Sequence, residues 1–187
     1  ESREQLQNVI QQIVADCNRV VNEASPIVDA RLRNGSRVNI VLDPVALNGP
    51  VVTIRRFPDK PIMMEDLIAF GSVTVEVCAW LQKLVQAKYN IMISGGTGSG
   101  KTTFLNALSY YIPQEERIIT IEDNAELQIL GLPNLVRMEK RNANVEGCSE
   151  ITIRDLIRTS LRMRPDRIIV GEVRGGEAFD MMQCLNT

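Results

Sequence analysis

The residues with the clearest chemical potential form a glycine-rich run in the middle of the chain. Residues 95–102 read Gly-Gly-Thr-Gly-Ser-Gly-Lys-Thr and follow the apolar run 91–94. This order fits G-x-x-x-x-G-K-[ST] between a predicted strand and a predicted helix. Glycines let backbone N–H groups curl around a phosphate, and the helix start adds unpaired N–H groups and a positive dipole end. We therefore predict a phosphate-binding loop rather than a flexible glycine loop without a ligand.

Two side chains of this loop are predicted to act on the nucleotide directly. Lys101 can reach the β- and γ-phosphates, and the Thr102 hydroxyl can ligate Mg²⁺. The predicted ligands are therefore ATP and Mg²⁺, with Lys101 also assigned to catalysis. The remaining predicted nucleotide-binding residues are Gly95, Gly96, Thr97, Gly98, Ser99, Gly100 and Thr103.

Two further apolar runs end in acidic residues. Residues 167–172 end at Glu172, and residues 117–122 end at Glu122, which Asp123 follows. Strand C-termini in a parallel sheet lie beside the phosphate loop, so these carboxylates should face the γ-phosphate, Mg²⁺ or the attacking water. The competing interpretation is a solvated polar group after a buried strand. We predict Glu172 and Glu122 as catalytic residues, and Asp123 and Glu172 as metal-associated residues beside the loop threonine.

These residues require a sheet that brings strand ends together, and the pattern from residue 90 onward predicts one. The expected strands are 91–94, 117–122, 134–138 and 167–172, and the expected helices are 101–111, 152–163 and one starting near Gly176. Thr152 with Asp155 resembles a helix N-cap. Alternating strands and helices indicate an α/β layer with a largely parallel sheet.

The preceding residues predict a smaller domain and a connection. Helical spacing of apolar residues indicates one amphipathic helix over 1–23, and 37–42 and 51–57 are expected strands. We place a small α+β domain at 1–57, a linker or hinge at 58–73 and the nucleotide-binding domain at 74–187. Two more helices are expected at 64–70 and 74–89.

Composition excludes several classes of protein. Lys and Arg total 21 against 23 Asp and Glu, a net charge of −2 that disfavours a dedicated nucleic-acid binder. Four cysteines without a C-x-x-C pair, and no histidine, disfavour a zinc site and suggest buried thiols in a reducing cytosol. The longest apolar candidate, 67–75, is far too short to span a membrane.

Three segments together resemble the type II/IV secretion ATPase superfamily. Residues 95–103, 121–127 and 161–178 are similar, in order, to its Walker A, aspartate-box and Walker B motifs. The family's Walker B motif ends in Gly-Glu, which accounts for Gly171 where other P-loop proteins carry aspartate. The nearest likeness is to the CpaF-type ATPase of Flp (tight adherence) pilus assembly, which residues 35–39, 52–57 and 65–71 also resemble.

The resemblance implies a fold, an assembly and a location. It implies a RecA-like P-loop ATPase domain preceded by a small, PAS-like α+β domain, in a homohexameric ring that drives pilin assembly or secretion. The ring would lie in the cytoplasm on the inner face of the cell membrane, against inner-membrane platform proteins, without nucleic acid and without a membrane span. Family members carry a histidine box after Walker B, so we expect the nucleotide-binding domain to be C-terminally truncated at Thr187.

Arginines of the front domain approach the nucleotide in this family when the two domains close. Arg55 and Arg56 end the last predicted strand of the front domain, and their side chains point in opposite directions, so only one should do so. The alternative is a salt-bridged strand end. An arginine at the γ-phosphate would let closure about the 58–73 hinge switch hydrolysis. For Arg137, Arg141 and Arg174 a structural ion pair is favoured over catalysis.

Three other functions fit a P-loop. A RecA-like nucleic-acid motor would bind DNA or RNA in a salt-sensitive manner, which the acidic balance and 4% aromatic content disfavour. A small-molecule kinase would need an acceptor pocket and a basic lid. A nucleotide-gated assembly scaffold would bind ATP and hardly cleave it, against which the two strand-end glutamates argue.

Overall fold

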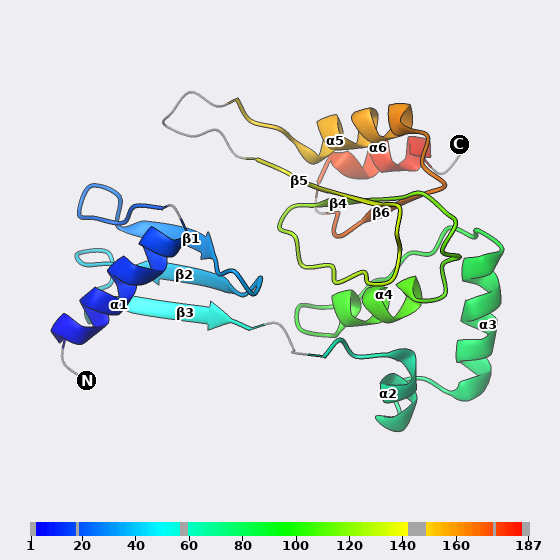
Figure 1. The fold of residues 1–187 in the computed structure, drawn as a ribbon, viewed down its shortest axis with the longest axis horizontal. Helices are drawn as coiled ribbons and strands as arrows, with labels where there is room; N and C mark the ends of the chain where they lie inside the picture. Colours follow the sequence, from blue (N-terminus) through cyan, green and yellow to red (C-terminus); the bar gives the residue numbers. More distant parts are fainter. Residues whose placement is uncertain (1–2, 18, 57–59, 142–148, 174, 185–187) are drawn as a thin grey trace. The chain divides into compact units, whose positions relative to one another are not determined.

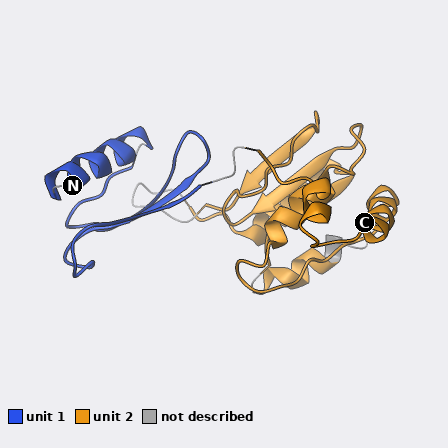
Figure 2. Cartoon of the chain, turned by 90° about the horizontal axis from the view of Figure 1, so that it is seen from below, with its two compact units in different colours: residues 1–59 blue, residues 60–187 orange. Residues whose placement is uncertain are grey.

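Two separate sheets organise the chain, one antiparallel and one parallel. The computed structural model describes residues 3–17, 19–56, 60–141, 149–173 and 175–184. The division between the units falls after residue 59, and Figure 2 colours residues 1–59 and 60–187 separately. Residues 60–73, expected in a linker, therefore group with the second unit.

Unit 1 is one helix packed on a three-stranded sheet (Figure 1). Its elements are α1 (Arg3–Asp16), β1 (Ile27–Arg31), β2 (Arg37–Val41) and β3 (Val51–Arg55), with β2 in the centre of the antiparallel sheet. Ile10 and Val14 lie one helical turn apart and pack against Val38 and Ile40 of β2. Alternate residues of β2 thus form the core together with one stripe of α1.

The predicted helix over residues 1–23 was wrong beyond Asp16. Asn22 and Ser25 pair across a turn, where the Ser25 backbone N–H donates to Asn22 Oδ1 at 2.9 Å. This local bond offers the backbone an alternative to helix just before Pro26. Strand β1 was not predicted, because polar residues interrupt its short edge sequence Ile-Val-Asp-Ala-Arg.

Unit 2 is built on a parallel sheet in the order β5-β4-β6, which confirms the predicted α/β class. The strands are β4 (Ile118–Glu122), β5 (Leu135–Glu139) and β6 (Arg167–Val170). Every residue of the central strand β4 is buried, as expected for a strand with neighbours on both sides and helices on both faces.

Helices cover the two faces of this sheet (Figure 1). One face carries α2 (Met64–Ala69), α3 (Val75–Gln86) and α4 (Lys101–Ser109); the other carries α5 (Ile153–Ser160), the 3-10 turn Leu161–Met163 and α6 (Glu177–Cys184). Ile118 packs with the first group, whereas Ile119 and Ile121 pack with α5. Since side chains alternate along a strand, Thr120 and Glu122 face the α4 side.

The strand predicted at residues 91–94 was wrong. None of the strand ladders among the described residues includes this segment. Ile93 packs against the core of the α4 face, but Ile91 and Met92 are exposed. Four apolar residues are too few to distinguish a paired strand from an extended segment that buries one side chain.

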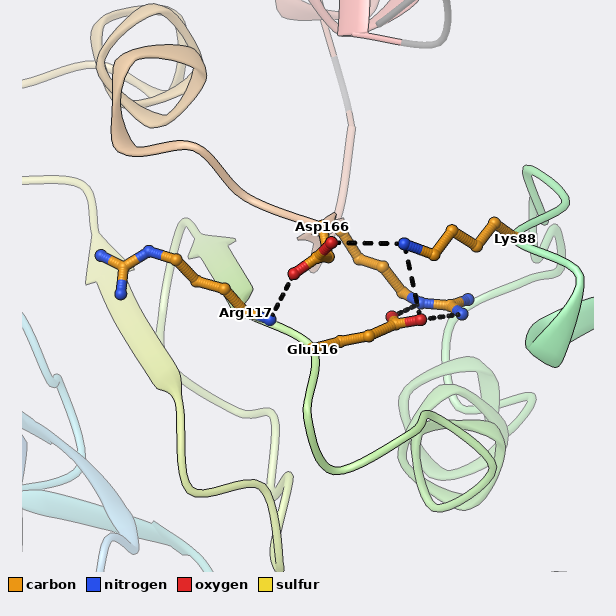
Figure 3. A network of polar contacts seen from close by, with 5 residues as sticks. Lys88, Glu116, Arg117 and Asp166 are labelled. Atoms are coloured by element: carbon orange, nitrogen blue, oxygen red, sulfur yellow. Dashed lines mark hydrogen bonds and ion pairs between the residues drawn. The ribbon is translucent and has the colours of Figure 1, made fainter.

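Charged residues tie the starts of β4 and β6 to the end of α3 (Figure 3). Glu116 forms an ion pair with Arg167, with Nη2 to Oε1 at 3.1 Å, and its Oε1 lies 3.6 Å from Lys88 Nζ. Asp166 lies 3.3 Å from Lys88 Nζ and accepts the Arg117 backbone N–H at 2.8 Å. We call Lys88, Glu116, Arg117, Asp166 and Arg167 the strand-start cluster.

Candidate nucleotide-binding site

The glycine loop has a backbone that only glycine adopts easily. Gly98 and Gly100 have φ of +74° and +87°, in the left-handed region. A Cβ on Gly95 would lie 2.6 Å from Ser99 Oγ. The Lys101 ammonium donates to the Gly96 carbonyl oxygen at 2.7 Å. The loop thus curls back on the first residue of α4 and holds its lysine against the loop backbone.

Helix α4 fixes this loop to the core and presents its N-terminus to the site. It begins at Lys101 after Gly100, which has no side chain to cap the first N–H groups. Ala107 and Leu108, near its other end, are buried in the unit 2 core. The unpaired N–H groups and the positive end of the helix dipole therefore lie beside the loop on a rigid support.

A small cavity brings the loop threonine and the acidic strand ends together. Its volume is about 40 Å³, and its lining residues are Thr102, Glu122, Asp123, Asn124, Glu126, Leu127, Gly171 and Glu172. The C-terminal ends of the parallel strands β4 and β6 supply the acids, and α4 supplies the hydroxyl. Unit 1 has a larger hollow of about 810 Å³ beside the 43–50 loop, but no carboxylate pair lines it. The residues that line it, rather than its volume, therefore make the smaller cavity the candidate nucleotide-binding site.

Glu122 is the most buried acid of the site. Its Oε2 accepts the backbone N–H groups of Glu126 at 2.6 Å and Leu127 at 2.7 Å. Among the described residues its Oε1 has no hydrogen-bond partner, and Arg137 Nη2 lies 3.9 Å from it. Burial raises the pKa of Glu122, although the two N–H bonds and Arg137 oppose this shift.

Asp123 and Glu172 occupy different settings within the same cavity. Asp123 forms an ion pair with Lys140, whose backbone N–H donates to the Glu122 carbonyl oxygen at 3.0 Å. Its negative charge is therefore partly neutralised by a neighbouring side chain. Glu172 follows Gly171 at the end of β6 and is half-buried in the cavity wall.

The predicted front-domain arginines lie in unit 1. Arg55 is the last residue of β3, and both Arg55 and Arg56 are exposed. Their approach to a nucleotide remains a prediction. Of the other arginines, Arg137 donates to the Leu127 carbonyl oxygen at 2.9 Å, Arg141 donates to the Ser149 carbonyl oxygen at 3.2 Å, and Arg174 lies outside the described residues.

Sequence reasoning included residues 124–127 in the aspartate-box resemblance but gave them no role at the cavity. Asn124, Glu126 and Leu127 line the cavity, and the next residue, Gln128, donates its backbone N–H to Asn106 Oδ1 of α4 at 3.0 Å. These contacts use main-chain groups, which every residue carries. Among these contacts, only the acceptor on α4 is a side chain. It belongs to Asn106, a polar residue within the stretch Phe-Leu-Asn-Ala-Leu of that helix.

Curated proteins of similar sequence come from archaea and bacteria. The chain is 43% identical over 192 residues to uncharacterized protein MJ0781 of Methanocaldococcus jannaschii, covering 99% of this chain and 26% of that protein. It is 38% identical over 188 residues to putative conjugal transfer protein Rv3659c of Mycobacterium tuberculosis (97% and 53% covered). It is 36% identical over 189 residues to type IV secretion system protein PtlH of Bordetella pertussis (90% and 56% covered). The chain thus spans about a quarter to a half of these relatives.

Solved structures and a family match agree with these relatives. The VirB11 ATPase of the Brucella suis type IV secretion system, in complex with sulphate, is 30% identical, with a TM-score of 0.51 over 96% of this chain and 58% of that one. The ATPase DotB of Legionella pneumophila is 19% identical, with a TM-score of 0.52 over 96% and 48%, which shows a shared fold. The family described as type II/IV secretion system protein matches residues 1–187. This chain therefore belongs to the type II/IV secretion system protein family.

Proposed function

We propose that this chain is the nucleotide-binding part of an ATPase motor subunit that powers secretion or pilus assembly. The observation that carries the proposal is the shared cavity of Thr102, Glu122 and Glu172. A phosphate loop alone supports binding, whereas hydrolysis also needs a group that orients water beside the γ-phosphate. Membership of the secretion family, and the VirB11 relative being an ATPase, support the same activity.

The loop would bind ATP mainly through its backbone. In this proposal the N–H groups of residues 95–103 and the start of α4 bind the phosphates. Lys101 exchanges its bond to the Gly96 carbonyl oxygen for bonds to phosphate oxygens, so the same ammonium stabilises the loop before and after ATP arrives.

The residues of the cavity fit Mg²⁺ as a shared ion. Among the described residues no group of three or more His, Cys, Asp or Glu side chains forms a metal site. That suits an ion that takes one or two protein ligands and completes its shell with water and phosphate oxygens. Thr102 would hold it directly, and Asp123 and Glu172 through water. When bound, Mg²⁺ would neutralise charge on the phosphate oxygens.

The two glutamates are proposed to act on the attacking water. Glu122 is held by two backbone N–H groups, so its carboxylate is fixed in place. We propose that it helps Glu172 to position and polarise the attacking water. Glu172 follows Gly171 after the end of β6 and lines the same cavity, and we assign it the orientation and polarisation of the attacking water.

The finer parts of the proposal rest on the motif resemblance. They are the CpaF-type role in Flp pilus assembly, the homohexameric ring, and an arginine, Arg55 or Arg56, that meets the γ-phosphate on domain closure. A peripheral place on the inner face of the cell membrane, beside platform proteins, belongs with them. In the described part of the chain no helix has the length and apolar character needed to cross a membrane.

Binding is tested on this chain with a fluorescent ATP analogue and thermal melting. Lys101→Ala should abolish stabilisation by ATP, while Lys83→Ala, an exposed lysine on α3, should bind like the wild type. Unchanged affinity in Lys101→Ala would refute the loop assignment.

Hydrolysis is tested on the full-length protein, with and without DNA or RNA. Glu172→Gln should bind ATP and turn it over at least about tenfold more slowly. Wild-type turnover in that variant would remove Glu172 from its role. Stimulation by nucleic acid would favour a nucleic-acid motor, and ATP binding without turnover in the wild type would favour the assembly scaffold.

A further inference from the structure

We propose that Gly171 is a positioning residue for Glu122. Its missing side chain leaves the space in which Glu122, from the neighbouring strand, extends into the cavity of Thr102. The effect on the nucleotide site rests on the proposed ATPase function. The packing of Gly171 against Glu122 is independent of that function.

Strand pairing places Gly171 directly beside Glu122. Strands β4 and β6 run parallel with Ile121 opposite Val170, and the Gly171 N–H donates to the Ile121 carbonyl oxygen at 2.8 Å. A Cβ at residue 171 would lie 3.0 Å from Glu122 Cγ and 3.7 Å from its Oε2. Van der Waals contact between carbons begins near about 3.5 Å, so any larger residue forces Glu122 to move.

Glu122 has little freedom to move. Its side chain is 2% exposed, and its Oε2 accepts the N–H groups of Glu126 and Leu127. A Cβ at residue 171 would require Glu122 to shift by a few tenths of an ångström, and this shift would strain both hydrogen bonds. The 126–127 backbone and Gly171 therefore hold the carboxylate from opposite sides.

The other carboxylate oxygen is the one left for a ligand. In the described part of the chain Oε1 has no hydrogen-bond partner, and Glu122 lines the cavity that Thr102 and Glu172 share. Most phosphate-loop ATPases place an aspartate on the Walker B strand to serve Mg²⁺. Here an aspartate at residue 171 would need the space that Glu122 fills. A side chain at residue 171 would thus shift the carboxylate that β4 supplies.

A double-mutant cycle tests the packing. Gly171→Ala should lower the melting temperature by about 5 °C, the cost of overpacking one methyl group. In a Glu122→Ala background the same change should cost almost nothing, because Cγ and Oε2 are gone and the nearest remaining atom, Cβ, is 3.6 Å away. Equal costs in both backgrounds would overturn the inference. Gly176→Ala is the matched control, since its Cβ would meet nothing nearer than 4.0 Å.

A binding measurement tests the consequence. The affinity for a fluorescent ATP analogue is measured with and without Mg²⁺. Gly171→Ala and Glu122→Gln should each reduce the Mg²⁺-dependent gain in affinity by about tenfold, since the negative charge of Glu122 is displaced or lost beside the residues that would hold the ion. An unchanged Mg²⁺ response in Gly171→Ala would refute the positioning role. If the wild type binds no ATP, the proposed function fails, while the melting cycle still decides the packing.

Discussion

The ion pair of Glu116 and Arg167 should contribute more to unit 2 than any exposed ion pair of the chain. Their side chains are 8% and 13% exposed, and two guanidinium nitrogens meet the two carboxylate oxygens. Glu116→Ala would leave the Arg167 charge buried without compensation. Removal of one partner of a buried pair costs about 3–5 kcal/mol, and the lower end, about 3 kcal/mol, suits a guanidinium that keeps some exposure.

Trp80 gives an assay specific to unit 2, because it is the chain's only tryptophan and lies on α3. A loss of about 3 kcal/mol in a unit of this size corresponds to a fall of about 10 °C in melting temperature. Thermal unfolding followed by Trp80 fluorescence measures this shift. Arg3→Ala is the matched control, because it removes an ion pair to Asp43 that is exposed and lies in unit 1. The control should leave the Trp80 transition in place.

A second variant separates lost attraction from an uncompensated charge. Replacing both partners, as Glu116→Leu with Arg167→Met, removes the buried charges together and should recover most of the stability lost in Glu116→Ala. A cost below about 1 kcal/mol for Glu116→Ala would show that solvent screens the pair, as at an exposed site. It would refute the reasoning from burial.

Three further predictions concern backbone conformation and a helix cap. Gly100→Ala should destabilise unit 2 by about 1–2 kcal/mol, because a Cβ is strained at φ +87°. Gly96→Ala is the control and should be as stable as the wild type, since its Cβ would meet nothing within 4 Å. Chemical denaturation measures the free energy of unfolding of both variants. Lys88 also has positive φ, so Lys88→Gly should be about 1 kcal/mol more stable than Lys88→Ala, although both lose the ion pairs. Hydrogen bonds from the Thr152 side chain and backbone lower the pKa of Asp155, so its stabilisation is present above its ordinary value and is lost as pH falls through the lowered pKa. Asp155→Asn should therefore lower the melting temperature near neutral pH, and the difference should shrink as the pH falls below 3.8.

The sequence predicted those parts of the site that depend on the spacing of residue types along the chain. The loop, α4 and the strands carrying Glu122 and Glu172 follow from a motif and from apolar runs that end in acids. The cap of α5 followed from Thr152 and Asp155, and the structure shows both reciprocal hydrogen bonds. Each of these signals is local, so a single chain reveals it.

What the sequence could not predict depends on contacts between distant segments. Glu122, 49 positions earlier in the chain, fills the space beside Gly171. The residues next to Gly171 in the sequence do not indicate this contact. The pairing of the Glu126 and Leu127 N–H groups with Glu122 could not be predicted either, because backbone donors are common to all residues. The apolar run at 91–94 predicted a strand, yet pairing depends on an available sheet edge rather than on the run itself.

The strand-start cluster and the cavity lie at opposite ends of the same two strands. At the start, the Asp166 N–H donates to the Arg117 carbonyl oxygen at 2.8 Å, and the Arg117 N–H donates to the Asp166 carboxylate at 2.8 Å. At the end, Glu122 and Gly171 lie side by side. A slip of one residue between β4 and β6 would move the strand ends by about 3.3 Å and turn alternate side chains to the other face. The glycine would then no longer lie beside Glu122. The contacts at the start therefore favour, together with the β4–β6 ladder, the register on which the arrangement of carboxylates at the end depends.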